Sequence, residues 1–137
     1  MIKLYIDTNI IIDAVEDRKN IFGKNIGNLA FKLFKEAMSC KYYVIISSFT
    51  IYELRKKCKG DTTLFFEMIK KKRIDVNHDE SDEEKARERN NDNLGDALHV
   101  ILAEKENANY IVTRNVDDFK DIQTKIPIRK PEQLLQT

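Results

Sequence analysis

Apolar residues follow two different spacings along this chain. In residues 1–6, 42–46 and 110–113 they form short, nearly continuous runs, rich in β-branched and aromatic side chains, that end at or just before a polar residue. Such runs are typical of strands that are buried on both faces. Between Ile26 and Met38 the apolar positions instead recur every three or four residues, and that spacing predicts an amphipathic helix.

Weaker signals continue the alternation of strands and helices. We expect further helices at residues 10–15, around Glu53, at 64–69 and at 97–103, and short strands at 74–76 and 126–128. Pro127 would place the last strand at an edge, and Pro131 suits the first turn of a helix. Residues 17–23 are turn-like, and the charged residues 79–93 fit either a solvated helix or a loop.

Strands that alternate with helices indicate an α/β fold, a sandwich built around a mainly parallel sheet. The 137 residues suit one domain, and no repeat or low-complexity tract divides them. We therefore expect a single α/β domain over residues 1–137.

The charge of the chain is nearly balanced, with a formal net value of +1. Basic residues still cluster at 55–59 and at 70–73, where they could grip phosphates or simply form a solvated helix face. Cys40 and Cys58 lack a metal-binding spacing and are predicted to be reduced thiols. Without a signal peptide or a membrane-length apolar segment, we expect a soluble, cytoplasmic protein with no membrane association.

Four acidic residues lie near predicted strand ends or helix starts. Asp7 ends the first strand, Glu53 lies on the helix after the second, Asp96 opens the 97–103 helix, and Asp118 follows the strand at 110–113. In open α/β sheets, ligands bind beyond the carboxyl ends of the strands. If the strands are parallel and adjacent, these acids converge at one edge.

Each acid taken alone also has a structural explanation. Asp7 and Asp96 could cap their helices, Glu53 could form a capping box with Thr50 or pair with Lys57, and Asp118 could belong to a turn. The functional interpretation therefore depends on their joint placement. His99 shares a helix face with Asp96 and is either a core histidine or part of the site, whereas Asp92 aligns with Asp96 only if the helix continues through Gly95.

Converged carboxylates repel one another, and a hard divalent cation such as Mg²⁺ or Mn²⁺ would relieve that repulsion. Such a site can activate water against a phosphodiester and stabilise the leaving oxygen. The chain has no phosphate-binding glycine loop and no nucleophilic serine or cysteine motif, and its two histidines argue against a histidine-based zinc site.

In four blocks the sequence resembles the PIN-domain ribonucleases, particularly VapC, the toxin of VapBC toxin–antitoxin pairs. The blocks are Asp7-Thr8-Asn9 after the first strand, Tyr52-Glu53-Leu54, Asp96-Ala97-Leu98-His99-Val100, and Thr113-Arg114-Asn115-Val116-Asp117-Asp118-Phe119. Their order and spacing span nearly the whole chain, which makes the set far more specific than any one block.

The resemblance implies a three-layer α/β/α (PIN-like) domain that hydrolyses RNA with Mg²⁺ or Mn²⁺. It further implies a homodimer and a small antitoxin protein that occludes the site. On this basis Asp7 and Asp96 would be the principal metal ligands, and Glu53 and Asp118 would complete the catalytic cluster. Thr8, Asn9, Thr113 and Asn115 would orient these groups from a second shell. Arg114 would meet substrate phosphate, and Asp118 is preferred to Asp117 because the family's acid directly precedes the phenylalanine.

Other functions remain open from the sequence. A receiver domain would need an acidic pair near Asp7, and a haloacid-dehalogenase-type phosphatase would need aspartate where Asn9 stands. A PIN fold that only binds RNA or protein is disfavoured by the presence of all four acids. The residues do not separate a toxin from a housekeeping RNA-processing nuclease, and they do not name the RNA that is cut.

Overall fold

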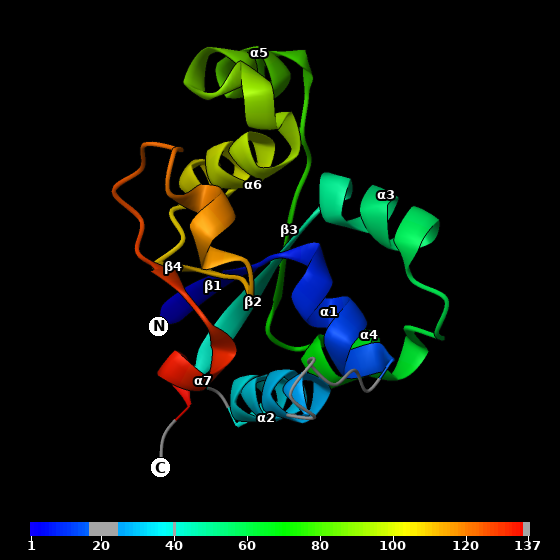
Figure 1. Ribbon diagram of the computed structural model, residues 1–137. Coiled ribbons are helices and arrows are strands. Elements are labelled where there is room, and N and C mark those ends of the chain that lie inside the picture. Colours follow the sequence, from blue (N-terminus) through cyan, green and yellow to red (C-terminus); the bar gives the residue numbers. More distant parts are fainter. Residues whose placement is uncertain (17–24, 40, 136–137) are drawn as a thin grey trace.

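Five parallel strands form the central sheet of this computed structural model, which describes residues 1–16, 25–39 and 41–135 (Figure 1). The strands are β1 (Ile2–Ile6), β2 (Tyr42–Ser47), β3 (Arg73–Val76), β4 (Tyr110–Val112) and β5 (Ile128–Arg129). Their order across the sheet is β3-β2-β1-β4-β5, and every neighbouring pair is parallel. The expected α/β fold with a parallel sheet is therefore confirmed.

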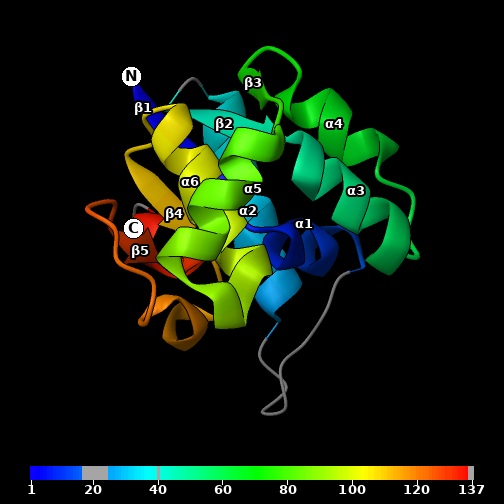
Figure 2. The same cartoon turned by 90° about the horizontal axis from the view of Figure 1, so that it is seen from above.

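Helices cover both faces of the sheet, which makes three layers (Figures 1 and 2). On one side lie α1 (Thr8–Val15), α2 (Ile26–Met38) and α4 (Thr63–Ile69), and on the other lie α5 (Glu80–Arg89) and α6 (Leu94–Lys105). The helix α3 (Ser48–Lys57) flanks the sheet beside β2 and β3, and α7 (Pro131–Leu134) packs near α2. Two short 3₁₀ turns, at Asn91–Asn93 and Val116–Phe119, complete the connections.

The alternation of side chains along β1 explains the two cores. Leu4 and Ile6 pack into the core beneath α1, α2 and α4, whereas Tyr5 enters the core formed with α6. All three are completely buried. A strand with opposite faces in two cores must be apolar at nearly every position, which is the pattern that identified it in the sequence.

The predicted elements are largely confirmed, with small differences. The charged 79–93 stretch is mainly the helix α5, which buries only Asp82 and Ala86 and begins with a capping box at Asp79. Gly95 does not interrupt a helix but lies in the first turn of α6, and the strand expected at 126–128 is displaced to Ile128–Arg129. The expected turn at residues 17–23 lies outside the described residues.

The strand order places a topological switch point between β1 and β4. The connections β1 to β2 and β2 to β3 run through α1 to α4, whereas the β3 to β4 connection runs through α5 and α6 on the other face. In such sheets a crevice opens beyond the carboxyl ends of the two strands at the switch. In the described residues, no helix is long and apolar enough to cross a lipid bilayer.

Candidate active site

Asp7 lies at the switch point, directly after β1. Its backbone N–H donates to the Val112 carbonyl of β4 at 2.9 Å, so the residue is fixed against the neighbouring strand. Asp7 occupies the N-cap position of α1, but its side chain makes no capping hydrogen bond. The carboxylate instead accepts a 2.8 Å hydrogen bond at Oδ2 from Thr113 Oγ1, across the end of the sheet. The alternative explanation of Asp7 as a side-chain cap is therefore wrong, and its buried carboxylate is held against the residue that follows β4.

Asp96 reaches the same region from the first turn of α6. The N-cap of this helix is Asn93, so Asp96 does not cap it, and Asn93 Nδ2 donates to Asp96 Oδ2 at 3.0 Å. Burial raises the pKa of Asp96, and the charges of Asp7 and Asp118 raise it further, against opposing contributions from Asn93 and His99. The raised pKa indicates that three acids, from three different segments, share one electrostatic environment.

The adjacent acids Asp117 and Asp118 have different surroundings. Asp117 forms an exposed ion pair with Lys120 at 2.7 Å and points to solvent. Asp118 contributes to the raised pKa of Asp96, and its carbonyl accepts a 3.0 Å hydrogen bond from Asn93 Nδ2. Asn93 thus joins the α6 start to the turn after β4, and Asp118 is the acid of this pair whose charge contributes to the raised pKa of Asp96.

Glu53 approaches from α3 and is tied to protein donors. Its Oε1 accepts hydrogen bonds from Thr8 Oγ1 at 2.6 Å and from His99 Nε2 at 2.7 Å, and its Oε2 pairs with Lys57 at 3.2 Å. Burial opposes its ionisation, but the His99, Thr8 and Lys57 interactions outweigh burial and lower its pKa to about 2. The helix N-cap is Ser47, so the expected capping box of Glu53 with Thr50 is wrong, while the pair with Lys57 is confirmed.

His99 is both a buried core histidine and a neighbour of the acids. Burial disfavours its charge, but interactions with Tyr5, Glu53 and Asp7 outweigh burial and raise its pKa to about 10. A protonated His99 donates from Nε2 to Glu53 and from Nδ1 to the Tyr5 hydroxyl at 2.6 Å. Its Nε2 is also 3.7 Å from Asp7 Oδ1. The imidazolium therefore offsets part of the negative charge at the crevice.

A second layer of hydroxyl groups holds His99. The Tyr5 hydroxyl lies 2.9 Å from Ser47 Oγ, and Ser47 Oγ in turn donates to Thr50 Oγ1 at 3.0 Å. With His99 as the first donor, the Tyr5 hydroxyl accepts from Nδ1 and donates to Ser47 Oγ, which in turn donates to Thr50 Oγ1 and also accepts from the Thr50 N–H at 2.9 Å. This chain fixes the ring of His99 and, through it, the position of Glu53.

The predicted supporting residues fall into two groups. Thr8 and Thr113 touch Glu53 and Asp7 directly, as the distances above show. Asn115 is exposed and contributes its backbone N–H to Thr113 Oγ1 at 3.1 Å, whereas no side-chain hydrogen bond joins Asn9 to the acids within the described residues. Arg114, expected to meet substrate, instead donates to Glu132 of α7 at 2.7 Å. Asp92 is an exposed residue of the 3₁₀ turn, separate from α6.

Two residues that support the candidate site, Asn93 and Tyr5, were not identified from the sequence. Asn93 bridges Asp96 and the Asp118 carbonyl, and its position three residues before Asp96 at a helix start was a usable signal. Tyr5 was assigned only to the apolar strand. Its hydroxyl needs a partner when buried, but the sequence does not show which residue supplies it.

A divalent cation at this site would have only one or two protein carboxylates as ligands, and water would supply the others. No group of three or more His, Cys, Asp or Glu side chains is arranged around a common metal position in the part of the chain that the structure describes. The oxygens of Asp7 and Asp96 nevertheless suit Mg²⁺, which commonly uses one or two carboxylates and keeps several waters. Burial first, and then the charges of Asp7 and Asp118, raise the pKa of Asp96, and a bound cation would favour its ionised form against both effects.

The fold and the site together define a class: a parallel α/β/α domain with acidic side chains gathered at the carboxyl edge of its sheet. A family model described as the PIN domain matches residues 4–125. The chain belongs to the PIN domain family, whose members are generally nucleases.

Two solved structures share the fold. VapBC2 from Rickettsia felis, bound to a DNA fragment from their promoter, matches with 18% identity and a TM-score of 0.60, over 94% of this chain and 98% of that one. VapBC-1 from nontypeable Haemophilus influenzae matches with 20% identity and a TM-score of 0.60, over 96% and 99% of the two chains. A search of curated proteins found no match.

Proposed function

We propose that this protein is a Mg²⁺- or Mn²⁺-dependent endoribonuclease, with Asp7, Glu53, Asp96 and Asp118 as its catalytic acids. The observation that carries the proposal is the gathering of acids from separate segments at the carboxyl end of the sheet. Thr113 holds Asp7 there, and Asn93 joins Asp96 to the turn that carries Asp118. Membership of the PIN family supports nuclease chemistry, because its members generally hydrolyse nucleic acids.

Asp7 and Asp96 would hold the cation. Thr113 fixes Asp7 through Oδ2, and Asn93 fixes Asp96 through Oδ2, so each carboxylate retains a second oxygen for a ligand. Bound there, the cation would supply the positive charge that activates water and stabilises the charge developing on the phosphate. Asp118 would act at the open side of the site, directly or through water.

Glu53 would have a positioning role as well as a charge. Its Oε1 already accepts two hydrogen bonds, so it would act on the site mainly through Thr8 and His99 or through a water on Oε2. Thr8, Asn9, Thr113 and Asn115 would form the supporting shell, with Thr8 and Thr113 as the members whose side chains contact the acids.

We further propose that the protein acts as the toxin of a toxin–antitoxin pair. The support is the fold shared with the VapBC structures together with the four motif blocks of a VapC toxin. The partners would then be an RNA substrate, a small antitoxin protein and a second copy of this chain as a homodimer. We also propose that residues 1–137 form a single domain and that the protein acts in the cytoplasm.

The direct test is cleavage of labelled RNA by purified protein with Mg²⁺, Mn²⁺ or EDTA. We expect cleavage with either metal, none with EDTA, and a loss of at least a hundredfold, about 2.7 kcal/mol, in Asp7→Asn and Asp96→Asn.

Adjacent acids provide the matched control. Asp118→Asn should lose activity, whereas Asp117→Asn should retain it, because Asp117 is paired with Lys120 at the surface. Equal loss in both variants would contradict the assignment of Asp118. Cleavage that persists in EDTA, or in both Asp7→Asn and Asp96→Asn, would contradict the metal-dependent mechanism.

A further inference from the structure

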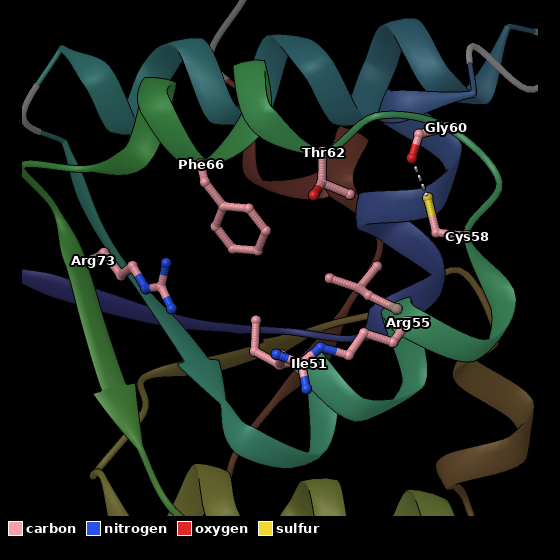
Figure 3. A pocket seen from close by; sticks show the side chains of 8 residues that line it. Ile51, Arg55, Cys58, Gly60, Thr62, Phe66 and Arg73 are labelled. Atoms are coloured by element: carbon pink, nitrogen blue, oxygen red, sulfur yellow. Dashed lines mark hydrogen bonds between the residues drawn. The ribbon is translucent and has the colours of Figure 1, made fainter.

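A groove runs between α3, α4 and β3, on the side of α3 away from Glu53. It consists of two adjoining cavities of about 500 Å³ and about 520 Å³, and both are lined by Ile51, Arg55 and Arg73. Figure 3 shows the first cavity, where the guanidinium groups of Arg55 and Arg73 both point into the space below the ring of Phe66. We call the two cavities together the α3–α4 groove.

The groove carries positive charge that the protein neutralises only in part, through Asp75. Within the described parts of the chain, Arg55 has neither an ion pair nor a hydrogen-bond partner. Arg73 pairs with Asp75 through Nε at 2.7 Å and stacks 4.8 Å from the centre of the Phe66 ring, which leaves its two terminal nitrogens available. The first cavity has two arginines and no acid among its lining residues.

The groove also adjoins the candidate active site. Its second cavity is lined by Ser47 and Ser48, at the carboxyl end of β2, and Ser47 Oγ bonds the Tyr5 hydroxyl that holds His99. Tyr52, next to Glu53 on α3, lines this cavity with half of its surface exposed, and the Lys56 ammonium lies 4.5 Å from its ring centre. Glu53 and the groove therefore lie on different sides of α3, and the residues at the N-terminal end of this helix, Ser47 and Ser48, line the groove.

We propose that the α3–α4 groove binds the phosphate backbone of the RNA strand that enters the acidic site, with Arg55 and Arg73 as its phosphate contacts. This inference rests on the proposed ribonuclease function. Guanidinium groups match phosphate geometry through two parallel hydrogen bonds. Cationic side chains beside exposed aromatic rings are the arrangement by which proteins bind single strands without sequence preference. The apolar floor of Ile51, Leu54 and Phe66 provides a surface for sugar and base faces.

Binding can be tested without turnover. The affinity of a labelled single-stranded oligouridylate would be measured by fluorescence anisotropy in EDTA, in an Asp7→Asn background, across a range of salt concentrations. We expect Arg55→Gln to weaken binding about tenfold, the loss typical of a hydrogen bond to a charged group. It should also reduce the slope of log affinity against log salt by about 0.7, the value for one phosphate contact on a single strand.

Three further variants complete this test. Arg55→Lys should keep the salt slope and recover part of the affinity, because it retains the charge but not the planar fork. Arg87→Gln removes the same charge from an exposed position of α5 and should bind as the parent does. Arg73→Gln should reproduce the Arg55→Gln effect, with circular dichroism to verify that the loss of its Asp75 and Phe66 contacts leaves the fold intact.

The outcomes separate this inference from the proposed function. Equal binding by Arg55→Gln and Arg87→Gln would overturn the groove assignment even if the wild-type protein cleaves RNA. If an oligoglutamate peptide binds in an Arg55-dependent manner while oligouridylate binding is unchanged, the groove is a protein-docking site, and the inference is also overturned. Failure of the cleavage assay would count against the nuclease function alone, because the anisotropy measurement requires no catalysis.

Discussion

The carboxylate of Asp7 occupies a helix N-cap position without capping the helix. A free capping residue would gain about 1 kcal/mol from that hydrogen bond. Here Thr113 holds the side chain instead, across the β1–β4 junction. Glu53 and Asp96 depart from their expected capping roles in the same way, because Ser47 and Asn93 occupy the N-cap positions. The side chains of Asp7 and Glu53 thus contact residues of other segments instead of capping their own helices.

Thr113→Val tests the support of Asp7. The substitution keeps the shape of the side chain and removes the hydroxyl donor, so Asp7 Oδ2 loses its 2.8 Å hydrogen bond. Loss of such a supporting group typically costs tenfold to a hundredfold in metal affinity or activity, and we expect a decrease of about that size. Thr113→Ser retains the hydroxyl and should stay close to wild type in a metal titration. Unchanged affinity in Thr113→Val would show that Asp7 needs no such support.

The ion pair of Glu53 and His99 predicts how stability depends on pH. The Glu53 pKa is lowered to about 2, so its contribution is present above its unfolded value and is lost as the pH falls through about 2. The His99 pKa is raised to about 10, so its contribution is complete below its unfolded value and is lost as the pH rises through about 10. The stabilisation by the pair is therefore greatest in the window between the two unfolded values, roughly pH 4.5 to 6.5.

Urea unfolding in EDTA can measure this dependence in the wild type and in Glu53→Gln. The difference in free energy of unfolding between the two proteins should be largest near pH 6 and should shrink as the pH rises toward 10. A difference that stays constant over this range would mean that His99 is not held in its charged form by Glu53.

At the scale of elements, strong periodicity in the sequence was sufficient to predict most helices and strands. The run from Ile26 to Met38 and the buried strands β1 and β2 agree with the pattern nearly to the residue. The helix α5 escaped a definite prediction because only Asp82 and Ala86 are buried, so its stability comes from the Asp79 capping box and ion pairs such as Lys105–Asp82 at 2.8 Å. The capping box is local, but the ion pair joins residues 23 positions apart, which periodicity does not reveal.

The candidate site, like the secondary structure, could be predicted from the sequence only in part. The four acids and their order could be identified from the sequence, because each follows a recognisable strand or starts a helix. The bridge of Asn93 to the Asp118 carbonyl and the chain from Tyr5 to Glu53 through His99 could not, because they depend on strand order and packing. The strand order β3-β2-β1-β4-β5 itself is not encoded in any single motif.

Two glycines give opposite predictions for the same substitution. A Cβ at Gly60 would lie 2.7 Å from Val15 Cγ1, and the β-branched Val15 side chain on α1 has little freedom to move. Gly60→Ala should therefore lower the free energy of unfolding by about 1–3 kcal/mol. At Gly95, in the first turn of α6, no atom lies within 4 Å of the added Cβ, so Gly95→Ala should stabilise by about 0.5 kcal/mol. Urea denaturation of both variants, with effects of the same sign, would contradict this account.

The topology of the whole molecule places the candidate catalytic residues at one edge of the sheet. Because the strand order reverses direction between β1 and β4, Asp7 and Thr113 meet at the carboxyl end of the sheet, where proteins with such sheets bind their ligands. Asp96 lies in the first turn of α6, on one face of the sheet, and Glu53 lies on α3. The parallel topology therefore accounts for the meeting of residues separated by most of the chain.

If the acids that meet here form a divalent-metal site, calorimetric titration with Mn²⁺ will detect it. We predict a saturable binding event in the wild type and in Asp117→Asn, lost in Asp7→Asn and Asp96→Asn, with circular dichroism confirming that all four proteins are folded. Because the pKa of Asp96 is raised, binding at mildly acidic pH should also release protons, and the measured heat should vary with the ionisation enthalpy of the buffer. Absence of Mn²⁺ binding to the folded wild type, or equal binding by Asp7→Asn and Asp96→Asn, would contradict the account.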